Sequence, residues 1–204
     1  MRAEPTVHVV DDDAAVREAL RRVIASLRVR VETHASAEQF LRAFDPARPG
    51  CVVLDVRLGG TNGLDLQEQL AASGAPIPVI IITAYGTVQT AVRAMRAGAV
   101  DVLEKPFDPR ELRERVRQAV ERDRSTRRQR AEKETLSAGV DLLTPREQEV
   151  LGLSLVGKTA KEIGEALNLS ARTVEVHRAR ILTKTGASSV SELAKRLSPE
   201  RSEP

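Results

Sequence analysis

Three carboxylates, a hydroxyl and an ammonium follow separate apolar runs in the first half of the chain. Asp11 and Asp12 come directly after TVHVV, Asp55 follows CVVL, Thr83 ends VIIIT, and Lys105 follows VDVLE. Gathered in one place, such carboxylates could hold Mg²⁺, which prefers oxygen ligands. A lysine and a threonine beside the cation could bind a phosphoryl group, and one carboxylate could attack its phosphorus. Each residue alone is a weak signal, because an aspartate at a helix start is most often a cap.

The elements that must bring these residues together are strands and helices in alternation. Short runs rich in β-branched residues predict strands at 6–10, 29–33, 51–54, 79–83 and 100–103. Longer stretches between them have helical spacing, such as 16–27. This order predicts a five-stranded parallel sheet covered by helices on both faces. Ligands bind beyond the carboxyl ends of strands in such sheets, so all five side chains should meet at one edge.

A highly charged helical segment follows from residue 109 to about residue 133. Its apolar stripe consists of Leu112, Val116, Ala119 and Val120 and then fades. The loss of the stripe favours a last helix that continues as a solvated linker over a helix extended into a dimeric coil. We therefore expect a first domain at 1–120, a helical linker at 121–141 and a second domain at 142–204.

The second domain contains four short helical patterns and no convincing strand. Thr144, Thr159 and Ser170 are placed as N-caps, and Pro145 suits a first helical position. The segment TAKEIGEALNLSARTVEVHRARILTKTG predicts a helix-turn-helix, with a support helix at 159–167 and a recognition helix at 172–183.

One face of the predicted recognition helix can enter a major groove. Glu175 could accept a hydrogen bond from cytosine N4, while Val176 and Ala179 could contact thymine methyl groups. The other residues expected to contact DNA, mostly through phosphates, are Lys158, Lys161, Arg172, Thr173, Arg178, Arg180 and Lys184. The alternative is a helical bundle with a solvated basic face. For Arg178 an internal ion pair with Glu147 or Glu149 is equally open.

Composition narrows the functional classes. The formal net charge is +3, with the positive excess in the second half, and Trp is absent beside one Tyr and three Phe. Base stacking on aromatic platforms is therefore not expected. A single cysteine, Cys51, excludes an internal disulfide, and His8, His34 and His177 lie far apart in sequence, so we expect no Cys/His metal site. Without an apolar stretch near membrane-spanning length, a soluble cytoplasmic chain is expected.

The motifs VDDD, VVLDVRL, IIITAYG and GAVDVLEKPF give residues 6–120 a clear family likeness. This segment resembles the receiver domain of two-component response regulators, a flavodoxin-like (βα)5 α/β fold. The resemblance implies these roles: Asp55 as phosphoacceptor; Asp11, Asp12, Asp55 and the Arg57 backbone carbonyl as Mg²⁺ ligands; Thr83 and Lys105 as phosphoryl-binding residues; Tyr85 as an aromatic switch.

The tail LTPREQEVL, with GKTAKEIGEALNLSARTVEVHRARILTKTGA, resembles the LuxR-type four-helix DNA-binding domain, and the whole chain resembles FixJ/NarL transcriptional regulators. The resemblance implies that a cognate sensor histidine kinase phosphorylates the receiver. Phosphorylation would then control homodimerisation, for which Val88, Val92 and Met95 form a reasonable face. The dimer would bind double-stranded DNA and regulate transcription, with activation through RNA polymerase weakly favoured; no enzyme activity is expected.

One departure and two rival functions accompany this reading. The family usually has Met-Pro after the position of Arg57, whereas Gly59 stands in place of the proline, which predicts a more flexible loop. A haloacid-dehalogenase-like phosphatase would need a second Asp two residues after Asp55, where Arg57 stands. A regulator that binds DNA constitutively, with the receiver as a mere interaction module, is the other rival.

Overall fold

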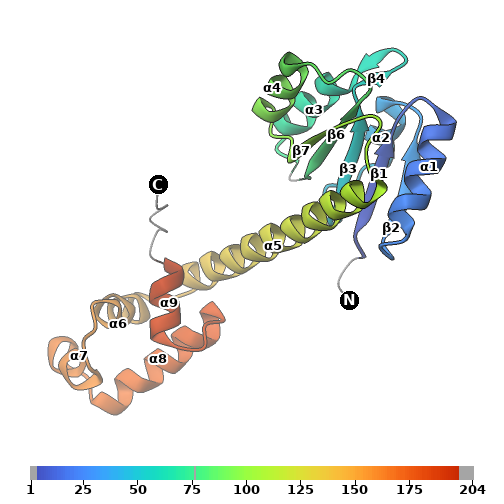
Figure 1. Cartoon of the computed structure of the whole chain (residues 1–204). Helices are drawn as coiled ribbons and strands as arrows, with labels where there is room; N and C mark the ends of the chain where they lie inside the picture. Colours follow the sequence, from blue (N-terminus) through green and yellow to red (C-terminus); the bar gives the residue numbers. More distant parts are fainter. Residues whose placement is uncertain (1–3, 76, 198–204) are drawn as a thin grey trace. The chain divides into compact units, whose positions relative to one another are not determined.

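The computed structural model describes residues 4–75 and 77–197 and divides into two compact units between Arg127 and Arg128 (Figure 1). The elements of the first unit are β1 (Thr6–Val10), α1 (Ala14–Ala25), β2 (Arg30–His34), α2 (Ala37–Ala43), β3 (Gly50–Asp55), β4 (Arg57–Leu58), β5 (Thr61–Asn62), α3 (Gly63–Ala72), β6 (Val79–Thr83), α4 (Val88–Arg96) and β7 (Asp101–Glu104). Helix α5 (Pro109–Asp141) belongs to both units, and the second unit continues with α6 (Pro145–Leu155), α7 (Ala160–Leu167), α8 (Ala171–Thr185) and α9 (Val190–Leu197).

The first unit is built on a parallel sheet with the strand order β2-β1-β3-β6-β7. This confirms the expected α/β architecture, although β2 and β7 each begin one residue later than the sequence pattern suggested. Strands β1, β3 and β6 are buried along their whole length. Helices α1 and α5 cover one face of the sheet, and α2, α3 and α4 cover the other (Figure 1).

Helix α5 contributes to the interior of each unit. The predicted stripe of Leu112, Val116, Ala119 and Val120 is buried against the sheet. One turn later, the Asp123 carboxylate is only 2% exposed and accepts hydrogen bonds from the Gly50 backbone N–H and the Arg127 guanidinium. Leu136, which the sequence pattern missed, is buried in the core of the second unit. No helix in the described part of the chain is both long and apolar enough to span a membrane.

Helices are the regular secondary structure in the described residues of the second unit, and no strand occurs among them, as expected. Thr144 and Thr159 cap α6 and α7 in capping boxes, and Ser170 caps α8, which confirms all three predicted N-caps. Asn168, in a left-handed conformation with φ of 53°, ends α7 and begins the turn to α8. Ile163 of α7 and Val174 of α8 meet in the core, so these two helices form the helix-turn-helix.

Candidate functional site

The carboxyl ends of β1, β3, β6 and β7 bring four of the five sequence-predicted side chains to one edge of the sheet. Asp11 directly follows β1, Asp55 ends β3 and Thr83 ends β6, while Lys105 follows β7 and is joined to Pro106 by a cis peptide bond. The Lys105 Nζ donates to Asp55 Oδ1 at 2.6 Å and to Asp11 Oδ2 at 2.9 Å. Asp11 and Asp55 lie 94 and 50 positions before Lys105 in sequence, and in the fold they share its ammonium.

Burial sets the electrostatics of this cluster. Asp11 is 1% exposed, and burial raises the pKa of its carboxyl although Lys105 and the Asp13 backbone N–H act against that change. Burial alone would lower the pKa of Lys105, but its hydrogen bonds to Asp55 and Asp11 outweigh that effect and raise it. The lysine is thus held as a cation between two carboxylates.

The remaining acidic residue stands apart from this pair. Asp12 is exposed and lies beside the loop that contains Gly59. Within the described residues, the oxygens of Asp11, Asp12 and Asp55 do not all come within 4.8 Å of one another. A donor set of carboxylates and a carbonyl still suits Mg²⁺, because that ion usually keeps several waters and needs few direct protein ligands.

Thr83 and Tyr85 lie on the other side of Asp55. The Thr83 side chain is buried, and its Oγ1 accepts a hydrogen bond from the Tyr85 backbone N–H at 3.1 Å. The Tyr85 ring is 62% exposed, and the Arg57 guanidinium lies over it at 4.3 Å from the ring centroid. Thus the expected switch residue points outward and is stacked on a cation.

The loop after Asp55 folds as a small hairpin that the sequence did not predict. Asp55 Oδ2 accepts from the Arg57 backbone N–H at 2.6 Å, and the short strands β4 and β5 pair around Gly59. Gly59 has φ of +65°, a value that proline cannot adopt. Proline could therefore not stand at position 59 in this conformation of the loop, and the flexibility of the loop stays a prediction.

Most of the predicted DNA-contacting residues are open to solvent on α7, α8 and the loop before α7. Those classed as exposed are Lys158, Lys161, Arg172, Glu175, Val176, Ala179 and Arg180. Thr173 is half-buried and its backbone N–H donates to Ser170 Oγ at the cap of α8. The two predicted helices and the loop before them thus leave these side chains accessible to a partner.

Arg178 has partners within its own domain. Its guanidinium pairs with Glu175 and donates to Ser154 Oγ and the Lys158 backbone carbonyl. The suggested ion pair with Glu147 or Glu149 is therefore wrong. The former pairs with Lys184 and the latter with Arg146.

Lys184 is engaged in the same way. Its Nζ donates to Glu147 Oε2 at 2.7 Å and to the Leu142 carbonyl at 3.1 Å. Glu147 is 3% exposed, and the hydrogen bond from Lys184 is the main cause that lowers its pKa to about 2. This internal role competes with the phosphate contact expected of Lys184.

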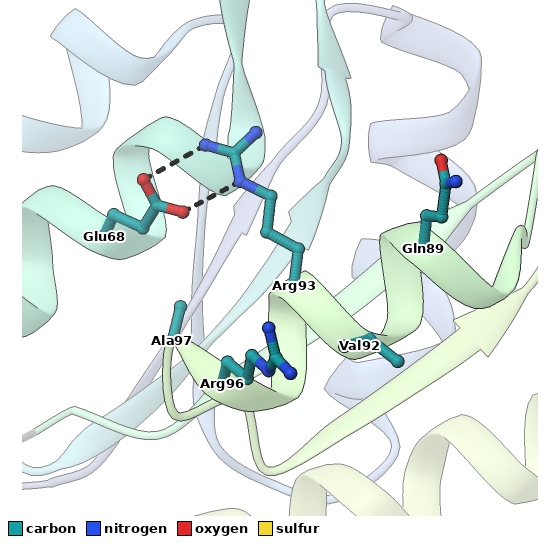
Figure 2. A pocket seen from close by; sticks show the side chains of 6 residues that line it. All are labelled: Glu68, Gln89, Val92, Arg93, Arg96 and Ala97. Atoms are coloured by element: carbon teal, nitrogen blue, oxygen red, sulfur yellow. Dashed lines mark hydrogen bonds and ion pairs between the residues drawn. The ribbon is translucent and has the colours of Figure 1, made fainter.

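A shallow pocket lies between α3 and α4, away from the acidic edge. Figure 2 shows Arg93 of α4 reaching Glu68 of α3, and Arg93 also pairs with Asp65. Next to this pocket the predicted dimer face is open: Val88 is 80% exposed, and Val92 and Met95 are also exposed. The ion pairs fix α4 against α3 while leaving its apolar residues accessible.

The expectation that the histidines lie far apart is wrong for two of the three. His8 and His34 are distant in sequence, but they lie on neighbouring strands, and His8 Nδ1 is 3.1 Å from His34 Nε2. Glu32 Oε2 lies 3.8 Å from the same His8 nitrogen. Parallel pairing of β1 and β2 removes the separation that sequence spacing indicated.

Comparison with known families matches both units. Residues 7–117 match the response regulator receiver domain, and residues 141–197 match the luxR family of bacterial regulatory proteins. The chain is a member of the response regulators. It is 42% identical over 189 residues to the transcriptional regulatory protein FixJ of Azorhizobium caulinodans, which covers 93% of this chain and 90% of that relative. The response regulator protein TodT of Pseudomonas putida is 38% identical, over 93% of this chain and 83% of its own length.

Solved structures of response regulators agree with both the fold and the domain order. The structure of StyR is 40% identical, covers 96% of this chain and 98% of its own, and has a TM-score of 0.81. Full-length FixJ from B. japonicum is 36% identical, covers 95% of this chain and 96% of its own, and has a TM-score of 0.60. As a response regulator with a LuxR-type domain, the chain couples phosphorylation to the regulation of transcription.

Proposed function

We propose that Asp55 is the phosphoacceptor and that a cognate sensor histidine kinase is the donor. The support is the position of Asp55 at the end of the central strand, where Lys105 binds one carboxylate oxygen and the Arg57 backbone N–H binds the other. In the transfer, a carboxylate oxygen bonds to phosphorus while the bond from phosphorus to the donor histidine nitrogen breaks. The Lys105 ammonium then neutralises negative charge on the phosphoryl oxygens, and the Thr83 hydroxyl donates a hydrogen bond to one of them.

Mg²⁺ is the cofactor proposed for this step. Asp11, Asp12, Asp55 and the Arg57 backbone carbonyl would hold it, in part through water. When bound, the ion offsets the negative charge that gathers on the carboxylates and the phosphoryl group. Lys105 is the chain's own contribution to the same task, because its ammonium already joins Asp11 to Asp55.

The signal is proposed to leave the site through Thr83 and Tyr85. In the structure, Thr83 Oγ1 accepts a hydrogen bond from the Tyr85 backbone N–H. When the Thr83 hydroxyl turns to a phosphoryl oxygen, this hydrogen bond breaks. Tyr85 can then leave its stacked position on Arg57, close to the start of α4. Homodimerisation through Val88, Val92 and Met95 is the output, since these apolar side chains are exposed together on one helix.

The dimer would place two α8 helices in successive major grooves of double-stranded DNA. The contacting set is proposed as Glu175, Val176 and Ala179 for bases and the exposed basic residues around them for phosphates. Activation through RNA polymerase and a cytoplasmic location complete the proposal. The proposed linker 121–141 joins the domains 1–120 and 142–204, and it is packed at both ends, through Asp123 on the first unit and Leu136 in the second. Two copies on one DNA raise each other's effective concentration, so phosphorylation strengthens binding.

The central experiment compares wild type with Asp55→Asn and with Asp45→Asn, an exposed surface control. All three are incubated with acetyl phosphate and Mg²⁺, and the phosphorylated fraction is measured. Asp55→Asn should take up no phosphate and keep its basal DNA binding, whereas Asp45→Asn should behave as wild type. Stoichiometric uptake by Asp55→Asn would show that the acceptor is another residue.

Two further measurements separate this proposal from its rivals. We propose that the chain is not a phosphatase for foreign esters, because the position two residues after Asp55 carries Arg57, whose guanidinium stacks on Tyr85. Several turnovers per second on a phosphate ester would contradict this. DNA affinity with and without beryllofluoride, a phosphoryl mimic, should differ; equal affinities would indicate a constitutive DNA-binding protein.

A further inference from the structure

His8, Glu32 and His34 form a compact polar cluster on the face of the sheet opposite α1 and α5. His8 and Glu32 are register partners in β1 and β2, and His34 lies two residues beyond Glu32 on the same face. One potential ligand atom from each residue, two imidazole nitrogens and a carboxylate oxygen, lies within 4.8 Å of the others. The receiver chemistry described above uses none of these side chains.

The spacing of the three atoms is close to that of ligands around one ion. Two nitrogens bound tetrahedrally to Zn²⁺ lie about 3.3 Å apart, given metal–nitrogen bonds of roughly 2.0–2.1 Å. The distance from His8 Nδ1 to His34 Nε2 is 3.1 Å, and that from His8 Nδ1 to Glu32 Oε2 is 3.8 Å. All three atoms lie within 4.8 Å of one another, so small rearrangements of the side chains would bring them around one ion.

The surroundings suit a metal that prefers nitrogen ligands. Both histidines are nearly buried, and the Phe40 ring lies 5.3 Å from that of His8 and 5.6 Å from that of His34. Burial lowers the pKa of both imidazoles, which favours the neutral form that binds a metal. Arg30 binds Glu32 Oε1 and leaves Oε2 directed at His8. Because β2 is an edge strand and Glu32 is partly exposed, an ion can enter from that edge.

We propose that His8 Nδ1, His34 Nε2 and Glu32 Oε2 bind a Zn²⁺-class transition ion, with water as the fourth ligand. Two imidazoles and one carboxylate select Zn²⁺, Co²⁺ or Ni²⁺ over Mg²⁺ and Ca²⁺. The ion would tie the edge strand β2 to β1. This site is independent of the phosphorylation of Asp55, so the failure of either proposal leaves the other standing.

The test uses the full chain, freed of metal and held in excess Mg²⁺, and titrates it with Co²⁺ and then Zn²⁺. Wild type should bind one ion per chain with the visible spectrum of four-coordinate Co²⁺, and Zn²⁺ should displace it. Removing any one ligand in His8→Gln, His34→Gln or Glu32→Gln should weaken Zn²⁺ binding at least about tenfold, since losing even an outer partner of a ligand costs that much. His177→Gln, which changes the one histidine outside the cluster, should bind as wild type.

Imidazole nitrogen NMR of the wild-type chain gives a second readout, which holds even if the variants fail to fold. With Zn²⁺, His8 Nδ1 and His34 Nε2 should both be unprotonated; without it, the two nitrogens share one proton in a hydrogen bond. Zn²⁺ affinity equal in wild type and all three cluster variants would overturn the proposal. So would unchanged nitrogen signals at saturating Zn²⁺, which would leave the histidines as a hydrogen-bonded pair only.

Discussion

Replacing Lys184 by methionine should destabilise the second unit and leave DNA binding almost unchanged. The Lys184 ammonium is 2.7 Å from Glu147 Oε2, and the Glu147 side chain is 3% exposed. Removing one partner of a fully buried pair costs about 3–5 kcal/mol. Here the Lys184 side chain is 32% exposed, and Thr144 still donates twice to Glu147, so water and the cap recover part of that cost. We therefore expect a loss of about 2 kcal/mol.

Urea unfolding followed by far-ultraviolet circular dichroism measures this loss, with hydrogen exchange of the α8 amides to assign it to the second unit. Lys161→Met, at an exposed lysine of α7, is the matched control and should stay within about 0.5 kcal/mol of wild type. The dependence of DNA affinity on salt should keep its wild-type slope in Lys184→Met. Two results together would refute the reasoning: a free energy of unfolding of Lys184→Met as close to wild type as that of the control, and a slope of log affinity against log salt that is smaller in magnitude by about 0.9. They would make Lys184 a phosphate contact.

Three other changes test the first unit. Because burial lowers the pKa of His8 from 6.5 to about 4, stability present above pH 6.5 falls as the pH drops toward 4, with a loss of about 2 kcal/mol by about pH 5. Urea midpoints in the presence of chelator should show this loss in wild type and a smaller one in His8→Gln. Gly63→Ala should cost about 1–3 kcal/mol by the same assay, because its Cβ would collide with the Asp55 carbonyl, while Gly60→Ala meets no atom and should cost less. Asp123→Ala removes the buried acceptor of the amide that begins β3 and should cost about 1–3 kcal/mol; a thermal midpoint equal to that of wild type would contradict this.

The elements that could be predicted from sequence are those with strong local signals. Unbroken β-branched runs such as VIIIT need no tertiary information to indicate buried strands, and alternation with helices indicates that these strands run parallel. Because parallel strands have their carboxyl ends at one edge of the sheet, Asp55 and Lys105 are expected to lie at the same edge. The N-caps at Thr144, Thr159 and Ser170 were equally visible, because a cap depends only on the residues of one helical turn.

What sequence could not give depends on which strand or helix lies next to which residue. His8 and His34 are 26 positions apart, and only the pairing of β1 with β2 makes them neighbours. Lys184 could not be assigned to Glu147 from spacing, because the contact joins α8 to α6. The turn at Gly59 was also hidden, since a pair of glycines is compatible with many loop conformations.

The double role of α5 has a practical consequence for building hybrid regulators. A fusion joint placed at residue 120 would discard Asp123 and with it the acceptor for the Gly50 amide. A joint after residue 136 would separate Leu136 from the core of the second unit, in which it is buried. Residues 128–135 are exposed on every position and serve neither interior. Exchange of receiver domains between relatives should therefore succeed when the crossover falls within this exposed stretch of α5.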